Sequence, residues 1–304
     1  MPNTDGAAPG SGLRLLAVHA HPDDETITMG GLLALCADRG IATSLICCTD
    51  GKVATIFDPE YAANEAEIRP RLHQIREQEL REACDILGVS ELHFLRYGDS
   101  GMSGTETNDL PEAFWRADMD QAVRRVTEHI RRFRPQVVVT YDGNGGYGHP
   151  DHIQAHRVTL LAVEAARHAL YPELGESWEV SKLYYTAFPR SEAVRLSEMA
   201  KVAGVKPPWE DADPESLEFL TPDERVTTTV DCRDQLGRKR DALRAHRSQL
   251  TEDFAMLSVP EEFLRQHFFN EHFQLAMSRL PGTTPETDVF AGVAPLPVNG
   301  AVRA

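Results

Sequence analysis

Hydrophobic runs alternate with amphipathic stretches over the first half of the chain. Four runs are apolar on both faces and are interpreted as buried strands, at residues 13–20, 42–49, 91–97 and 136–141. Four stretches carry apolar positions at helical spacing, at residues 29–39, 71–87, 119–133 and 151–168. Strands buried on both faces and separated by helices indicate a parallel sheet covered on both sides. The pattern predicts an α/β fold with a Rossmann-like, doubly wound and mostly parallel sheet.

The second half is less regular. Two runs are interpreted as strands, at residues 180–187 and 226–232. Three stretches are interpreted as helices, at residues 191–202, 235–246 and 261–269. Residues 206–222 are acidic and proline-rich, which indicates an exposed loop. We expect residues 13–170 to form the core and residues 171–292 to form a C-terminal α+β addition over the active-site crevice. We expect flexible tails at residues 1–12 and 293–304.

Two short motifs place imidazole and carboxylate groups directly after predicted strands. His21-Pro22-Asp23-Asp24-Glu25 follows the first strand, and His149-Pro150-Asp151-His152 follows the fourth. In doubly wound sheets ligands bind in the crevice beyond the carboxyl ends of the strands, so the fold would bring both motifs together. His21, Asp24 and His152 form a ligand set that suits zinc with one position left open. The motifs therefore predict a metal-assisted hydrolase.

Other residues of the motifs can serve the reaction. Asp23 lies beside a ligand and could accept a proton from the attacking water. His149, if protonated, could stabilise an oxyanion or donate a proton to the leaving group, and Asp151 could orient its imidazole. Tyr147 could hydrogen-bond the reacting carbonyl, or it could be a loop aromatic that closes over the core. The flexible loop at residues 143–148 would let the backbone approach a ligand closely.

Three residues outside the motifs are also considered. Arg76 and Glu79 fall on or beside the apolar stripe of the helix at 71–87, where charged groups need partners. The two residues could form an ion pair, or Arg76 could project into the crevice. We favour the projection into the crevice. His246 could reach the site, but we expect a surface histidine.

Composition limits the partners. The 304-residue chain has a net charge of −16, which repels polyphosphates and argues against nucleic acid. Five cysteines without a Cys-x-x-Cys motif indicate reduced, buried thiols. The chain shows no signal peptide and no apolar run that spans a bilayer, so we expect a cytoplasmic protein. The expected partner is a small molecule, and the sequence leaves open whether the chain forms a homo-oligomer.

At these residues the chain resembles the LmbE-like (PIG-L) deacetylase family. The resemblance is carried by the two motifs, by Arg76 with Glu79, and by the sequence Asp99-Ser100-Gly101-Met102. Within the family the chain is similar to the N-acetylglucosaminyl-inositol deacetylase and the mycothiol S-conjugate amidase. It departs from both at Asp50-Gly51-Lys52-Val53, where a glycine-glutamate turn is usual, and at Met29, where the amidase has a lysine. Both departures would face the far end of the substrate.

The resemblance implies zinc held by His21, Asp24 and His152, with iron(II) or cobalt as alternatives. It also implies Asp23 as general base, His149 as electrophilic or acid partner and Tyr147 as a carbonyl contact. Arg76, Asp99 and Met102 would bind an amino-sugar substrate. The expected reaction is hydrolysis of an N-acyl, here N-acetyl, amide on a glucosamine-containing substrate such as N-acetylglucosaminyl-inositol. The alternatives are the S-conjugate amidase and a non-catalytic sugar-binding module.

Overall fold

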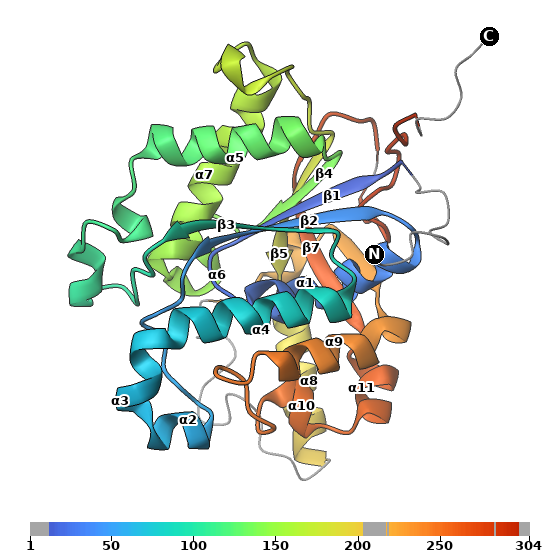
Figure 1. Ribbon diagram of the computed structural model, residues 1–304. Coiled ribbons are helices and arrows are strands. Elements are labelled where there is room, and N and C mark those ends of the chain that lie inside the picture. The colour runs from blue at the N-terminus through green and yellow to red at the C-terminus, as the bar shows by residue number, and fades with distance from the viewer. Residues whose placement is uncertain (1–11, 203–216, 218, 283, 298–304) are drawn as a thin grey trace, which may run out of the picture.

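The computed structural model describes residues 12–202, 217, 219–282 and 284–297. A single seven-stranded sheet runs through the described part of the chain, in the order β3-β2-β1-β4-β5-β7-β6 (Figure 1). The strands are β1 (Arg14–His19), β2 (Ala42–Thr49), β3 (Glu91–Tyr97), β4 (Val137–Thr140), β5 (Lys182–Ala187), β6 (Thr228–Asp231) and β7 (Asn270–Ser278). Most of the predicted tails at 1–12 and 293–304, and most of the predicted loop at 206–222, lie outside the described residues.

The sheet is parallel over five strands and antiparallel at one edge. β1 pairs with β2 and β4, β2 with β3, and β4 with β5, all in parallel. β7 runs antiparallel to both β5 and β6. The doubly wound, mostly parallel sheet is therefore confirmed. The sequence did not predict β7, although the residues from 171 onward supply three strands to the same sheet.

Helices cover both faces of the sheet (Figure 1). On one face α1 (Asp24–Asp38), α4 (Leu72–Leu87) and α9 (Leu236–Ala245) pack around a core that contains Leu33, Leu80 and Ala242. On the other face α5 (Met119–Phe133) and α7 (Pro150–Arg167) pack around Val126 and Val158. The predicted stripe of α4 is fully buried. All five cysteines are buried and free, as predicted.

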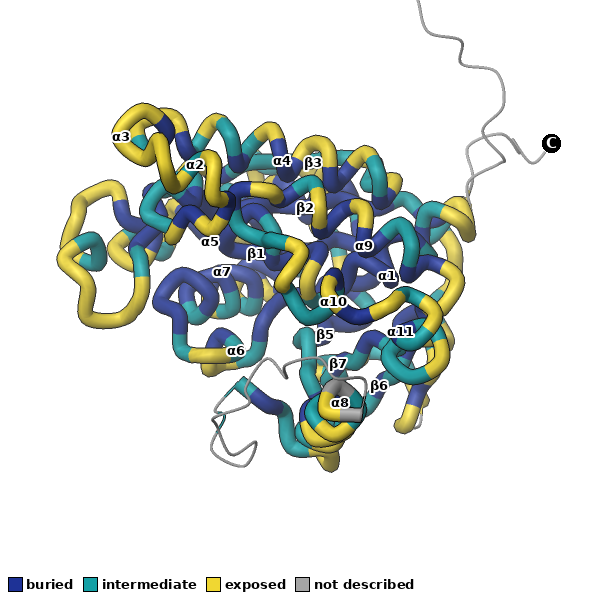
Figure 2. The backbone as a smooth tube through the Cα atoms, turned by 90° about the horizontal axis from the view of Figure 1, so that it is seen from below, coloured by how far each residue is buried: buried dark blue, intermediate teal, exposed yellow. Residues whose placement is uncertain are grey.

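Smaller helices complete the described part of the chain. Between β2 and α4 the chain forms α2 (Pro59–Ala63) and α3 (Glu65–Ile68). The others are α6 (Gly145–Gly148), α8 (Arg190–Val202), α10 (Ala255–Ser258) and α11 (Glu261–His267). Figure 2 shows β1 and α1 deeply buried at the centre, and α3 exposed at the periphery. No helix among the described residues is long and apolar enough to cross a membrane; the predicted cytoplasmic location stays a prediction.

α1 begins earlier than predicted, because the first motif forms its N-terminal turn. Asp24 is its first residue, and the helix is kinked at Met29, where φ is −146°. Met29 is fully buried, and its sulfur lies 3.3 Å from Nε2 of His19. The expectation that Met29 faces the substrate is therefore wrong. The kink separates the turn that carries the motif from the part of α1 that packs on the sheet.

Candidate active site

The two motifs lie at the carboxyl ends of β1 and β4, which are neighbours in the sheet. Here the strand order reverses direction, since β2 and β3 lie on one side of β1 and β4 and β5 on the other. Such a switch point forms a crevice between diverging loops. His21 follows β1, and His152 lies in the first turn of α7. The fold therefore brings the predicted ligands together, as the sequence indicated.

The three predicted ligands converge with the spacing of a zinc site. Nδ1 of His21 lies 3.1 Å from Nε2 of His152. Oδ2 of Asp24 lies 3.3 Å from the first of these nitrogens and 3.4 Å from the second. Ligands at zinc–nitrogen and zinc–oxygen distances in a tetrahedron are separated by about 3.3–3.4 Å. The residues present therefore fit a tetrahedral ion with one open position.

The hydrogen bonds of the His21 and His152 imidazoles leave one nitrogen lone pair of each ring facing the point where the three ligands converge. Nδ1 of His152 lies 3.1 Å from the carbonyl oxygen of Gly145, so it carries the proton. Nε2 of His21 lies 3.3 Å from Oδ2 of Asp151 and 3.6 Å from Oδ1 of Asp99, so it is the donor on that ring. With both rings neutral, the two ring nitrogens and the Asp24 carboxylate are three acceptors that meet at one point. Such a cluster is stabilised by a cation.

The surrounding carboxylates increase this demand for positive charge. Burial lowers the pKa of His21, but the carboxylates of Asp99, Asp151 and Asp24 outweigh it, and the pKa is raised well above its usual range. Burial raises the pKa of Asp24, but His152 and His21 hold it well below its usual range. The site therefore favours an ionised Asp24 together with positive charge at the His21 ring.

Asp23 is held in a strained backbone conformation beside the cluster. Its φ of 118° lies in the left-handed region that residues with a side chain rarely adopt. Nη2 of Arg76 donates to Oδ2 of Asp23 at 3.1 Å, and Oε2 of Glu25 accepts the Asp23 backbone N–H at 3.2 Å. Burial raises the pKa of Asp23 to about 6, with Arg76 opposing and Asp24 and Glu25 adding to the shift. A carboxylate of this pKa suits a general base at neutral pH.

His149 has a different partner from the one expected. Its Nδ1 accepts the backbone N–H of Asp151 at 3.1 Å, so a neutral ring carries its proton on Nε2. The Asp151 carboxylate instead contacts His21 and accepts hydrogen bonds from the backbone N–H and hydroxyl of Ser100. The predicted role of that carboxylate in orienting His149 is therefore wrong. Burial, His21 and His152 lower the pKa of His149 to about 3, which leaves the imidazole neutral.

Arg76 points toward the site but does not pair with Glu79. Its Nη1 donates to the carbonyl oxygen of Gly51 at 2.8 Å, and its Nη2 donates to the carbonyl oxygen of Pro22 at 2.6 Å. Glu79 instead accepts hydrogen bonds from the backbone N–H and the hydroxyl of Ser248. Of the two alternatives, the ion pair with Glu79 is wrong, and Arg76 instead contacts Asp23 at the edge of the site. Its guanidinium supports the backbone and side chain around Asp23.

The remaining predicted residues surround the cluster at different depths. Asp99 is buried, and its Oδ1 accepts the backbone N–H of Gly101 at 2.8 Å. Met102 and Tyr147 are about half exposed. The ring of Tyr147 lies edge-on to His152, with centroids 5.0 Å apart. Asp99 is therefore buried beside His21, while Met102 is exposed and Tyr147 lies at the mouth of the site.

Sequence reasoning missed two contributions. The hydroxyl of Tyr141 donates to Oδ2 of Asp24 at 2.6 Å and accepts the backbone N–H of Ala20 at 2.7 Å. Tyr141 ends a predicted strand beside the second motif, which is the signal that could have identified it. His246 was expected at the surface, but it is fully buried and its Nε2 lies 3.2 Å from Oε1 of Glu25. That expectation is wrong because α9 packs against α1 and α4.

A second group of potential ligands on the described chain already holds a cation. Glu91, His93 and His129 bring ligand atoms within 4.8 Å of one another. Nη2 of Arg132 lies 3.0 Å from Oε2 of Glu91, 2.9 Å from Nε2 of His93 and 3.1 Å from Nδ1 of His129. The guanidinium therefore neutralises this group.

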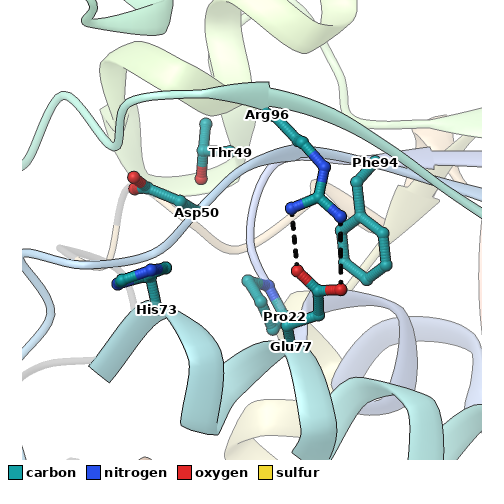
Figure 3. A pocket seen from close by; sticks show the side chains of 7 residues that line it. All are labelled: Pro22, Thr49, Asp50, His73, Glu77, Phe94 and Arg96. Atoms are coloured by element: carbon teal, nitrogen blue, oxygen red, sulfur yellow. Dashed lines mark hydrogen bonds and ion pairs between the residues drawn. The ribbon is translucent and has the colours of Figure 1, made fainter. Parts of the chain in front are cut away.

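Two cavities lie near the motifs. The larger, of about 580 Å³, opens directly on Asp23, Asp24 and His152. The smaller, of about 140 Å³, lies behind Pro22 and is crossed by the ion pair of Glu77 and Arg96 (Figure 3). Its wall includes Asp50, the residue at which the chain departs from the glycine-glutamate turn. The smaller cavity contains none of the predicted ligands.

Comparisons with known proteins agree with the site. A family model described as PIG-L, GlcNAc-PI de-N-acetylase, matches residues 16–163, which include both motifs. A relative from Geodermatophilus obscurus, named 1D-myo-inositol 2-acetamido-2-deoxy-alpha-D-glucopyranoside deacetylase, is 44% identical over 288 residues, covering 92% of this chain and 98% of the relative. That similarity extends well beyond the motifs and includes most of the C-terminal region.

Solved structures share the fold. GalB, the 4-carboxy-2-hydroxymuconate hydratase from Pseudomonas putida, has a TM-score of 0.61 and 20% identity, over 89% of this chain and 99% of that chain. N,N'-diacetylchitobiose deacetylase from Pyrococcus horikoshii has a TM-score of 0.53 and 22% identity, over 86% of this chain and 83% of that chain. Such structures establish the fold alone, since the hydratase carries out a different reaction. With the family model and the relative, the chain belongs to the PIG-L family, as the resemblance of its motifs predicted.

Proposed function

We propose that this protein is a zinc-dependent N-deacetylase that hydrolyses the N-acetyl amide of a glucosamine-containing substrate such as N-acetylglucosaminyl-inositol. The observation that carries the proposal is the position of Asp23, an unligated carboxylate held beside three converging ligands. A site that only bound sugar would have no need for a strained, buried base. The name of the relative from Geodermatophilus obscurus supports the same substrate class.

The ligands His21, Asp24 and His152 would hold the ion. When bound, zinc would acidify water and polarise the amide carbonyl. Asp23 takes a proton from the attacking water at its carboxylate, while Arg76 keeps that carboxylate oriented. The protonated Asp23 then returns this proton to the amide nitrogen as the carbon–nitrogen bond breaks. Acetate and a free amine leave.

His149 would stabilise the negative charge that develops on the carbonyl oxygen. Its neutral ring carries a proton on Nε2, so it donates a hydrogen bond without first gaining a proton. The hydroxyl of Tyr147, at the mouth of the site, is a second donor. Because its pKa is lowered to about 3, His149 is neutral near pH 7 and has no acid proton to give. Asp23, which has just gained a proton from the water, is therefore the better donor to the leaving amine. Asp99 and Met102 would lie on the sugar side of the ion.

Acetate release from N-acetylglucosaminyl-inositol by the zinc-loaded protein tests this proposal under single-turnover conditions. Stoichiometric acetate supports a deacetylase. Binding of the sugar without acetate indicates a binding module and contradicts the proposal. Parallel incubation with a mycothiol S-conjugate separates the deacetylase from the amidase alternative.

A further inference from the structure

The larger cavity is much bigger than an acetyl group needs. Its volume of about 580 Å³ is typical of pockets that bury a ligand of drug size. It starts at Asp23, Asp24, Tyr147 and His152 and continues to β5, α8 and the region around α10. Figure 2 shows β5, β7, α8 and α10 close together in this part of the molecule. The reacting end and the distal end therefore belong to one continuous space.

The distal walls are built from large apolar side chains that come from separate parts of the chain. They include Phe57, Phe188, Phe219, Leu250, Phe254 and Phe268. Apolar walls of this kind favour an apolar ligand, since burying each methylene is favourable while burying an unpaired hydroxyl is not.

The charged groups that line the same cavity are engaged with the protein. Glu271 accepts hydrogen bonds from the Lys239 ammonium at 2.6 Å and from the backbone N–H groups of Gly31 and Leu32, each at 2.7 Å. Glu192 accepts a hydrogen bond from Arg195 at 2.7 Å. A polyol in this space would compete with these bonds. An apolar chain would leave them intact.

The position of the cavity relative to the ligands indicates which part of the substrate would enter it. Neither Asp99 nor Met102, which lie on the proposed sugar side, lines the cavity. The amide carbon would lie between the proposed sugar side and the cavity. Its nitrogen, which carries the sugar, would then face Asp99 and Met102, and its acyl chain would face the cavity. The acyl group is therefore the part directed at the apolar walls.

We propose that this cavity binds an apolar N-acyl chain longer than acetyl, so that the enzyme also removes medium-chain acyl groups from a glucosamine nitrogen. This inference rests on the proposed function and uses the same residues and chemistry. Water adds to the carbonyl carbon, the carbon–nitrogen bond breaks, and a fatty acid and a free amine result. The cavity contributes binding of the chain close to the reacting carbon.

A series of N-acylated glucosaminyl-inositols carrying acetyl, butanoyl, hexanoyl or octanoyl groups tests the inference in the zinc-loaded protein. We expect kcat/KM to rise about threefold to fourfold for each methylene that enters the cavity. A steep fall beyond acetyl would overturn this inference and leave the deacetylase intact. Loss of activity on every member, acetyl included, would overturn the proposed function itself.

Two further arms distinguish the acyl chain from other occupants. The octyl glycoside of N-acetylglucosamine places the apolar chain on the sugar side instead. If the octyl glycoside gains in kcat/KM while octanoyl does not, the cavity holds the aglycone, and the inference is wrong.

Substitutions in the wall provide the second arm. Ala255→Trp fills the distal space, and Phe254→Asn makes its wall polar. Each should lower the ratio of octanoyl to acetyl turnover at least tenfold, with zinc content reporting that the variant is folded. The control Leu161→Trp lies on the exposed surface of α7, outside the cavity, and should leave the ratio unchanged. An unchanged ratio in both wall variants would contradict the inference.

Discussion

Nε2 of His246 lies 3.2 Å from Oε1 of Glu25, although 221 positions separate the two residues. The other carboxylate oxygen of Glu25 accepts the backbone N–H of Asp23. His246 and Glu25 are both fully buried, so water cannot replace either partner. The pair connects the end of α9 to the turn that carries the proposed base. It thereby helps to hold Asp23 in its left-handed backbone conformation.

Replacing His246 should weaken catalysis without removing the metal. In His246→Ala, Glu25 loses its partner and the turn at Asp23 relaxes, so we expect kcat to fall about 10- to 100-fold. His168→Ala, which removes an exposed histidine that pairs with Glu164, is the control and should keep wild-type kcat. Zinc content and kcat of both variants check this. Wild-type kcat in His246→Ala would show that the pair is only structural.

Gly51 should tolerate no side chain, because of its contact with Arg76. A Cβ at this position would lie 2.3 Å from Nη1 of Arg76 and would displace the guanidinium from Asp23. We expect Gly51→Ala to lower kcat at least tenfold. Gly175→Ala is the matched control, since Gly175 also has a positive φ but its Cβ would meet nothing within 4 Å. Each variant strains a positive-φ backbone and should lose about 1–3 kcal/mol of stability, and only Gly51→Ala should lose activity.

The two adjacent aspartates of the first motif should have separable roles. Asp23→Asn should bind zinc normally and lose about 10²- to 10⁴-fold in kcat, the usual contribution of a general base. Asp24→Ala should lose zinc, because a ligand at the centre of the cluster is removed. Zinc analysis and acetate release of both proteins check the assignment. Normal turnover by Asp23→Asn would contradict the role of Asp23 as base.

The pH dependence should report Asp23. The reaction needs the ionised carboxylate, and burial raises its pKa to about 6. We therefore expect kcat/KM to fall about tenfold per pH unit below pH about 6 and to level off above it. Arg76 opposes the shift, so Arg76→Gln should move this acid limb to higher pH. An acid limb near pH 4 in the wild type, as for an ordinary aspartate, would show that another group is titrating.

Much of the fold could be predicted from the sequence because it depends on local pattern. In β4, for example, Val137, Val138 and Val139 are buried on both faces of the sheet. A strand buried on both faces needs apolar residues at every position, and the sequence shows this as a continuous apolar run. β7 was missed because its pairing with β5 and β6 is formed only in the folded chain. Its buried Glu271, which binds Lys239 and two backbone amides, reads as a surface residue in the sequence.

The ligands could be predicted for a similar reason. His21 and His152 follow strands whose ends the fold class brings to one edge of the sheet. His246 could not, since its place depends on how α9 packs against α1 and α4. The partner of His149 was also hidden, because Nδ1 accepts the backbone N–H of Asp151, whereas the sequence suggested a contact with the Asp151 carboxylate. Packing between distant segments and backbone hydrogen bonds leave no periodic signal in a sequence.

The most direct test of the account is a zinc titration of the metal-free protein with acetate release as the readout. Our account predicts no acetate release without zinc, and a linear rise that saturates at one equivalent per chain. His152→Ala, which removes one of the three converging ligands, should not recover under the same conditions. Full activity of the metal-free protein, or equal recovery of His152→Ala, would contradict the ion that His21, Asp24 and His152 are inferred to share.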